Sequence, residues 1–341
     1  MKYLYNTSVL TLTFLIITSS LYGAIWRLNN NSNVDADFTN LEQVNDSSYV
    51  LPGDTILVEG SAINYGSADI NKQLYIFGTG YYLNENPQTQ ANPSNAAVSS
   101  IDFEVGSEGS VFAGFEVTGS IDVFASDVVI KRNRISNYGV DVENNVSNVL
   151  IIQNYIEVYN SDVIYVADGS NNIFIQNNLL RDTYTSSSYY AIETYGTASA
   201  IVSNNVIAGN LDVSLSVLSN NIFMRGNYTG SNNQISNNIF GEEPIDTSKF
   251  PDPNLVNVDL TAVFDTTCAT CHSTDGKLQI FDDGPAAGFG IDSVDCGMYG
   301  GVNPYVLSGI PEIPSIFYFY APNTATAESG LPVKVKIKSN R

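Results

Sequence analysis

The amino-acid sequence predicts an all-β fold, a single-stranded right-handed parallel β-helix, and three observations support this prediction. A short phrase in which apolar residues flank an asparagine recurs between 128 and 240. The residues around each asparagine are β-branched or aromatic and therefore favour strands. No amphipathic run between successive phrases is long enough for a helix. A self-similar period of about 20 residues indicates one structural unit per repeat, so we expect one coil of short strands per phrase.

Asparagine suits the turn of each phrase because it tolerates the left-handed backbone conformation better than most residues. Stacked on the asparagines above and below, its amide can also hydrogen-bond along a ladder. Successive strands then lie about 4.8 Å apart in parallel sheets. A leucine-rich repeat also has an asparagine ladder, but here isoleucine and valine dominate and the period varies widely. The repeated asparagines are Asn133, Asn154, Asn177, Asn204, Asn220 and Asn237.

The start of the chain has the features of a secretory signal peptide, which we assign to residues 1–24. A lysine precedes an apolar run from Val9 to Ile17, and small residues lead to Ala24. The run is too short for a transmembrane helix, and no second apolar segment follows. We therefore expect no transmembrane segment after cleavage, and a secreted, extracellular or cell-surface protein that is a monomer.

The chain carries 35 acidic and 14 basic side chains, which gives a net charge of −21. Such a surface repels nucleic acid and anionic lipid, so we expect no nucleic-acid partner. A polyanionic substrate would need a metal ion or local basic residues. Solubility outside the cell accounts for most of this charge without any ligand.

Residues 25–80 are predicted to form an N-terminal cap and the first coils. The segments PGDTILVEGS and LYIFGTG each join a glycine turn to an apolar strand. Followed by asparagine-ladder coils, they resemble the secreted bacterial right-handed parallel β-helix repeat proteins of the pectate-lyase-like superfamily. The resemblance covers about residues 25–300 and implies the fold. It implies no single activity, because that fold hosts lyases, hydrolases, epimerases and proteins without known activity.

The β-helix is predicted to span residues 81–300, with a tyrosine-rich insertion between Asn177 and Asn204. Insertions in a solenoid project from one edge and often frame a binding groove. Tyrosine can stack on a sugar ring while its hydroxyl bonds to sugar hydroxyls. We therefore predict carbohydrate contact by this insertion, although tyrosine is abundant in the chain and also fills loops. The candidate residues are Asp182, Tyr184, Tyr189, Tyr190 and Tyr195.

Four coils carry an aspartate eight residues after the repeated turn position, and each aspartate precedes a valine: Asp122, Asp141, Asp162 and Asp212. Neighbours in a strand face opposite sides, so the valines enter the core and the aspartates form an outer column. Stacked carboxylates repel each other, which raises their pKa values or favours a bound cation. We predict a Ca²⁺ site ahead of the paired carboxylates of a glycoside hydrolase. The alternative is an acidic outer face without a ligand.

The resemblance implies recognisable catalytic motifs for an active member. Calcium-dependent lyases of the superfamily combine acidic calcium ligands with an arginine base, and its polygalacturonase-type hydrolases carry a histidine motif and an Arg-Ile-Lys motif. The chain has one histidine, His272, outside the ladder, and neither arrangement is evident. We therefore predict no catalytic residues and a non-catalytic protein that binds glycan or has a structural or adhesive role. A polysaccharide lyase or glycoside hydrolase acting on an extracellular polysaccharide is the alternative.

The pentapeptide Cys268-Ala-Thr-Cys271-His272 matches the C-x-x-C-H attachment site of haem c. No flanking helical domain is predicted that could bury a haem. A disulfide, either between Cys268 and Cys271 or from one of them to Cys296, fits an oxidising compartment and is the favoured interpretation. The pairing stays open at the level of sequence.

Residues 301–341 are predicted to form a C-terminal cap and a β tail. Pro311 and Pro314 interrupt the chain, and 315–320 and 331–337 are apolar enough for strands. The second of these strands alternates apolar residues with lysine, which is typical of an edge strand.

Overall fold

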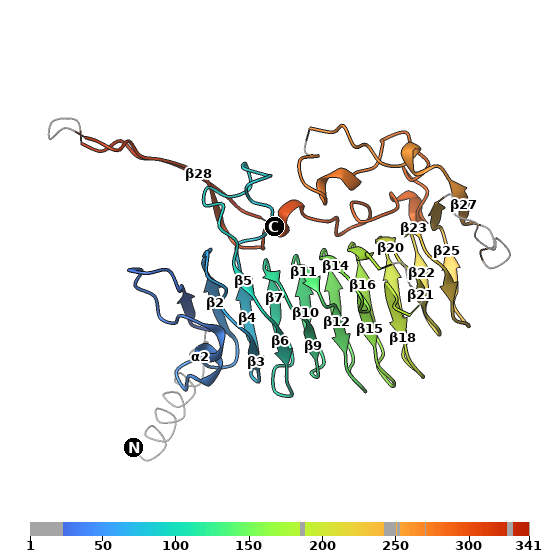
Figure 1. Cartoon of the computed structure of the whole chain (residues 1–341), viewed down its shortest axis with the longest axis horizontal. Helices are drawn as coiled ribbons and strands as arrows, with labels where there is room; N and C mark the ends of the chain where they lie inside the picture. Colours follow the sequence, from blue (N-terminus) through green and yellow to red (C-terminus); the bar gives the residue numbers. More distant parts are fainter. Residues whose placement is uncertain are drawn as a thin grey trace, which may run out of the picture.

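The computed structural model describes residues 23–184, 188–241, 250, 253–269, 271–325 and 330–340. Within them, three parallel sheets wind into one right-handed parallel β-helix, which confirms the predicted fold (Figure 1). The predicted signal peptide lies outside the described residues, apart from its last two positions. No helix in the described part of the chain has the length and apolar character needed to cross a membrane.

A complete coil contributes one strand to each of the three sheets, and the coils at the two ends contribute fewer. The ten-stranded sheet contains β1 (Ile25–Leu28), β2 (Asp54–Val58), β4 (Leu74–Phe77), β7 (Val111–Ala113), β10 (Val129–Lys131), β13 (Leu150–Ile152), β16 (Ile173–Gln176), β19 (Ala200–Ser203), β22 (Val217–Ser219) and β25 (Gln234–Ser236). The nine-stranded sheet contains β5 (Ala97–Val98), β8 (Glu116–Val117), β11 (Arg134–Asn137), β14 (Tyr155–Val158), β17 (Leu179–Asp182), β20 (Val206–Ala208), β23 (Ile222–Arg225), β26 (Ile239–Gly241) and β27 (Leu255–Val258). The eight-stranded sheet contains β3 (Ala68–Ile70), β6 (Ile101–Phe103), β9 (Ile121–Val123), β12 (Val140–Val142), β15 (Ile164–Val166), β18 (Ile192–Thr194), β21 (Leu211–Asp212) and β24 (Tyr228–Thr229).

The core lies inside the coils, where aliphatic side chains from successive strands stack in register. Ile130 pairs with Ile151, and Ile151 pairs with Ile175 on the next coil. All three side chains are fully buried. Burial of one such side chain stabilises the fold by about 1.5–3 kcal/mol relative to leaving it exposed. Helix α2 (Leu41–Asp46) adds Leu41 and Val44 to this core at the N-terminal end.

A buried ladder of asparagine amides runs along one corner of the coils. The Asn154 Oδ1 atom accepts hydrogen bonds from the backbone N–H of Asn133 (2.9 Å) and from its side chain (3.2 Å). The Asn154 Nδ2 atom donates to the carbonyl of Ile130 at 2.9 Å, so each amide satisfies backbone groups that the turn leaves unpaired. The ladder consists of Asn133, Asn154, Asn178, Asn205, Asn221, Asn238 and Asn254.

Four of the predicted ladder residues, Asn177, Asn204, Asn220 and Asn237, stand one position before the ladder, and the prediction is wrong for them. Each is the first member of an Asn-Asn pair, and either member fits the repeated phrase. The first member adopts the left-handed conformation, with φ between 52° and 59°. We call this column of left-handed residues the outer turn column: Arg132, Gln153, Asn177, Asn204, Asn220 and Asn237.

The chain after β27 does not continue the coils, although residues up to 300 were predicted to belong to the β-helix. Residues 259–312, which we call the covering segment, run back along the outer surface of the nine-stranded sheet (Figure 1). They lack the repeated strand phrase and contain four short 3-10 turns instead. These turns are η2 (Leu260–Ala262), η3 (Gly276–Leu278), η4 (Ile291–Ser293) and η5 (Leu307–Gly309).

Side chains of the outer turn column hydrogen-bond to successive parts of the covering segment. Asn237 donates to the Phe289 carbonyl at 2.8 Å and Asn204 to the Asp295 carbonyl at 3.0 Å. Asn177 donates to the carbonyls of Met298 and Gly300 at 2.9 and 2.7 Å. Towards the N-terminal coils, Gln153 donates to the Pro304 carbonyl at 2.6 Å, and Arg132 to the Ile310 carbonyl at 2.9 Å. The segment therefore runs antiparallel to the direction in which the coils stack.

A buried polar network fixes the far end of the covering segment. The Asp275 carboxylate accepts from the Tyr305 hydroxyl at 3.2 Å and from the Ser308 backbone N–H at 3.0 Å. The Tyr305 hydroxyl also bonds to that of Tyr81, in the insertion after β4. From the same insertion, Asn86 donates to the Ser308 hydroxyl at 2.9 Å. The polar insertion near the start of the chain thus anchors the segment near its end.

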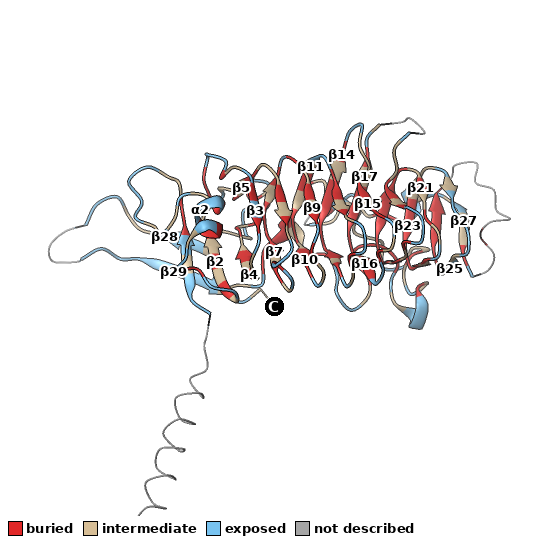
Figure 2. Cartoon of the chain, turned by 90° about the horizontal axis from the view of Figure 1, so that it is seen from below, coloured by how far each residue is buried: buried red, intermediate tan, exposed pale blue. Residues whose placement is uncertain are grey.

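The predicted C-terminal strands form an antiparallel hairpin, β28 (Ser315–Tyr320) with β29 (Lys334–Lys338). It projects beyond the N-terminal end of the coils, and most of its residues are exposed (Figures 1 and 2). Ile316 pairs with Ile337 and Phe319 with Val335, so one face of the hairpin is apolar. On the other side, the Lys336 ammonium lies 5.2 Å from the Tyr318 ring centroid.

Candidate functional site

The outer face of the eight-stranded sheet carries a column of carboxylates in strand register. Asp102 pairs with Asp122, and Asp122 pairs with Asp141. Tyr165 takes the next position, and the column then continues with Glu193. The members, which we call the acidic column, are Asp69, Asp102, Asp122, Asp141, Glu193 and Asp212.

The sequence identified three members of this column, Asp122, Asp141 and Asp212, and missed the other three. Asp69, Asp102 and Glu193 stand in the strands ADI, IDF and IET, where the acid lies between two apolar or small residues. That alternation was the signal that could have found them. Asp162 lies outside the column, in the turn before β15.

Asp162 nevertheless contacts a member of the acidic column, Glu193. Its Oδ1 atom accepts a hydrogen bond from the Tyr190 backbone N–H at 2.6 Å. Its carboxyl also hydrogen-bonds to that of Glu193, which lowers the pKa of Asp162 and raises that of Glu193. For Asp162, burial raises the pKa by more than the hydrogen bonds lower it, so its pKa is raised overall. The pair places the C-terminal end of the tyrosine insertion against the acidic column.

Three carboxyls of the acidic column have raised pKa values, because they are partly buried and lie beside other acidic groups. Burial, followed by the charges of Asp122 and Asp69, raises the pKa of Asp102 to about 6. Burial, followed by the charge of Asp122, raises the pKa of Asp141 to about 7. Burial, followed by the charge of Asp162, raises the pKa of Glu193 to about 7. At neutral pH such carboxyls can therefore donate as well as accept hydrogen bonds.

Tyr184 and Tyr189 of the tyrosine insertion form an edge-to-face cluster with Tyr159, which follows β14. The ring centroids of Tyr159 and Tyr184 lie 5.1 Å apart, and those of Tyr184 and Tyr189 lie 6.1 Å apart. Tyr195, two residues after Glu193, is 60% exposed. Residues 185–187 of the insertion are outside the described part of the chain.

Asp182, predicted as a carbohydrate contact, is fully buried at the base of the insertion. Its Oδ1 atom accepts from the backbone N–H of Tyr184 at 2.7 Å, and its carbonyl accepts from Arg225. Burial raises the pKa of its carboxyl. Its contacts position the insertion and do not present the carboxyl to solvent.

The described arginines on the coils after β1 lie on or beside the nine-stranded sheet, away from the acidic column. Arg132 is buried and contacts Glu312, and Arg134 pairs with Glu116. Arg181 pairs with Glu157 at 2.6 Å. These side chains hold the covering segment and neighbouring coils together.

Among the described residues, no group of three or more histidine, cysteine, aspartate or glutamate side chains is arranged to hold a metal ion. The parallel register explains this, because it spreads the carboxylates along a line instead of converging them on one point. Calcium binding by Asp122, Asp141, Asp162 and Asp212 stays a prediction.

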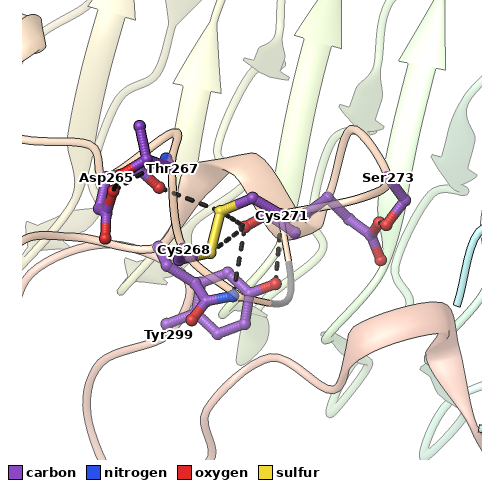
Figure 3. Close-up of a disulfide and its surroundings, with 9 residues drawn as sticks. Asp265, Thr267, Cys268, Cys271, Ser273 and Tyr299 are labelled. Atoms are coloured by element: carbon purple, nitrogen blue, oxygen red, sulfur yellow. Dashed lines mark hydrogen bonds between the residues drawn. A yellow bond between two sulfur atoms is a disulfide. The ribbon is translucent and has the colours of Figure 1, made fainter. Parts of the chain in front are cut away.

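The structure joins Cys268 to Cys271 by a disulfide in the covering segment (Figure 3). The Cys271 sulfur lies 3.1 Å from the carbonyl oxygen of Asp265 and 3.3 Å from that of Gly276. His272 is exposed next to it. With both sulfurs in the disulfide, neither is available for a thioether bond to haem. Cys296 is a buried free thiol, and burial, followed by the charge of Asp295, raises its pKa to about 12.

No protein-family model matches this chain, and no curated protein is significantly similar to it. The stacked parallel sheets establish a β-helix solenoid, whereas membership of the pectate-lyase-like superfamily rests on the resemblance of short segments.

Proposed function

We propose that this chain is a non-catalytic extracellular or cell-surface protein that binds glycan through the outer face of its eight-stranded sheet. The observation that carries the proposal is the acidic column beside exposed tyrosines. The apolar leader of the sequence, the disulfide and the strong negative charge all support a location outside the cell.

The acidic column offers the groups that sugar recognition requires. Ionised carboxylates accept hydrogen bonds from sugar hydroxyls, and carboxyls with a pKa near 7 also donate them. Tyr195 and the cluster around Tyr184 supply aromatic surface for the apolar faces of sugar rings. Because adjacent coils repeat at about 4.8 Å, these groups recur along a line that suits a polymer.

The negative charge of the chain limits the class of glycan that can bind. A net charge of −21 repels uronate-rich or sulfated polymers, and no described arginine contacts the acidic column to offset that repulsion. We therefore expect a neutral polysaccharide, or one that carries amino groups.

The raised pKa of Glu193 supports glycoside hydrolysis as the alternative function. A carboxyl with a pKa of about 7 is suited to act as the general acid of a glycosidase. Asp212, the register partner of Glu193 on the next coil, stands at about the 5 Å spacing that the second carboxyl requires, whereas the hydrogen-bonded Asp162 is too close. In this alternative Glu193 is the acid. Release of reducing ends from a bound polysaccharide, lost in Glu193→Gln, would favour hydrolysis over binding alone.

Titration calorimetry with neutral polysaccharides tests the proposal directly. The double variant Asp141→Asn with Glu193→Gln should lower affinity by roughly tenfold, because it replaces two carboxyls that bond to sugar. The matched control is Asp283→Asn, an exposed acid of the covering segment. Tyr195→Ala should also weaken binding, whereas Tyr49→Ala, at an even more exposed tyrosine in a distant turn, should not. Binding that is absent, or equal in all four variants, would refute the proposal.

A further inference from the structure

A pocket lies between the nine-stranded sheet and the covering segment, and from its lining we infer a binding site for a small amphipathic anion. The ligand class is a carboxylate or sulfonate attached to an apolar body. The pocket has a volume of about 430 Å³, which falls within the range of small-molecule sites. It lies on a different sheet from the acidic column, so this inference is independent of the proposed function.

A β-bulge shapes the floor of the pocket. Ile207 pairs with Phe223, but the next residue, Ala208, pairs with Arg225. Met224 is therefore the extra residue of the bulge, and it lines the pocket. Bulges re-aim side chains and are over-represented beside binding sites. Methionine also adapts its shape to irregular apolar ligands.

The apolar walls come from two stretches of the covering segment that clamp each other. Leu260 and Phe264 form one wall, and Leu278 and Phe281 form the other. The Phe281 backbone N–H donates to the Val263 carbonyl at 3.0 Å, which ties the two walls together. Four apolar side chains and Met224 thus provide the surface for an apolar body.

The disulfide lies within the loop that connects these two walls. Cys268 and Cys271 lie between Phe264 and Leu278, and the Cys271 sulfur contacts the carbonyls of Asp265 and Gly276 at the two ends of the loop. The disulfide restricts the conformations of the chain around it, so this part of the loop loses less conformational entropy when a ligand binds. The C-x-x-C motif thereby acquires a role in preorganising the pocket.

The charged side chains that line the pocket are basic and favour an anionic ligand. Arg181 and Lys277 line it, and no acidic residue does so among the described lining residues. This is unusual for a chain with 35 acids and 14 bases. Glu157 pairs with Arg181 at 2.6 Å and offsets one cation, which leaves the exposed Lys277 as the surplus charge. The nearest acid in sequence, Asp275, is buried and accepts hydrogen bonds from Tyr305 and Ser308 instead.

The first test uses three probes with the same eight-carbon chain and different head groups. Sodium octanoate, octanol and octylammonium are titrated into the oxidised full chain by calorimetry. Octanoate should bind about fivefold more tightly than octanol, since one partly exposed ion pair contributes an effect of this size. Octylammonium should bind most weakly. Equal affinities for the three probes, or no binding by any of them, would overturn the inference.

Two variants locate the site. Lys277→Gln should reduce octanoate affinity to that of octanol, whereas Lys336→Gln in the hairpin changes the same charge at a distance and should have no effect. Leu278→Trp should fill the pocket and weaken all three probes by at least about tenfold. If Leu278→Trp fails to fold, the comparison of the two lysine variants still tests whether octanoate binds in this pocket. Octanoate binding that survives in Lys277→Gln at full strength would place the site elsewhere.

Discussion

The outer faces of the nine-stranded and eight-stranded sheets differ in the polarity of their side chains: the first is apolar and the second acidic. On the nine-stranded sheet, the residue after the ladder asparagine is apolar in five coils and lies buried under the covering segment. These residues are Tyr155, Leu179, Val206, Ile222 and Ile239. On the eight-stranded sheet, the central outward residue is acidic in six coils and stays partly exposed. The choice of outward side chain therefore decides whether a face is covered by its own chain or stays exposed.

The two members of each Asn-Asn pair also differ, in whether they bond to the coils or to the covering segment. The second asparagine, such as Asn178, bonds to the coils themselves. The first, such as Asn177, bonds to the covering segment. One dipeptide thus stabilises the solenoid and also provides the track along which the chain returns over it.

Adding an acid to one face and removing one from the other should give the largest difference in stability. Val206→Asp puts an unpaired carboxylate beneath the covering segment and should cost about 3–5 kcal/mol of unfolding free energy. Asp141→Val on the acidic column should be neutral or stabilising, because it removes a repelled carboxyl. Urea denaturation followed by circular dichroism measures both. Similar losses in the two variants would remove the distinction between the faces.

Substitutions within one Asn-Asn pair should have smaller and unequal effects. Asn178→Ala leaves the Asn154 N–H and the Ile151 carbonyl unpaired in the core and should cost about 2–4 kcal/mol. Asn177→Gly keeps the left-handed turn and loses only the bonds to Met298 and Gly300, for about 1–2 kcal/mol. In the second variant, proteolysis should cut the covering segment first. The reverse order of stabilities would show that the ladder is misassigned.

The pH dependence of stability should come from the acidic column and should be smaller still. Asp141 and Glu193 have folded-state pKa values of about 7, above the unfolded values near 4. Between these values the folded state binds more protons than the unfolded state, so stability is highest near pH 4 and falls as the pH rises to about 7. After screening by solvent, the fall is about 1–2 kcal/mol.

Thermal unfolding of the Asp141→Asn, Glu193→Gln double variant measures this contribution. Its stability should decline less than that of the wild type between pH 4 and 7, and it should be the more stable protein at pH 8. Parallel pH profiles for the two proteins would contradict the assigned pKa values.

The sequence was sufficient for the fold, because apolar alternation and the repeated asparagine depend only on local spacing. It was not sufficient for the register of the acidic column, because the turns between sheets differ in length. Asp162 follows Asn154 by eight residues, but the longer turn before β15 puts Tyr165 in the column instead. A fixed count from the asparagine therefore fails wherever a turn is extended.

The covering segment was also missed, although the residues that hold it were visible. The apolar residue that follows the ladder asparagine in five coils has no place inside the coil, since its neighbours in the strand already fill the core. That pattern indicates a covered outer face. The identity of the cover depends on contacts between residues more than 50 positions apart, such as Asn237 with Phe289, which local patterns do not encode.

Hydrogen–deuterium exchange, with and without a neutral polysaccharide selected by calorimetry, tests the division between the two faces most directly. We predict that the ligand adds protection in β12, β15, β18 and the tyrosine insertion. The covering segment should be protected before the ligand is added and should not change. Protection gained in residues 289–310, with none in the eight-stranded sheet, would contradict the account.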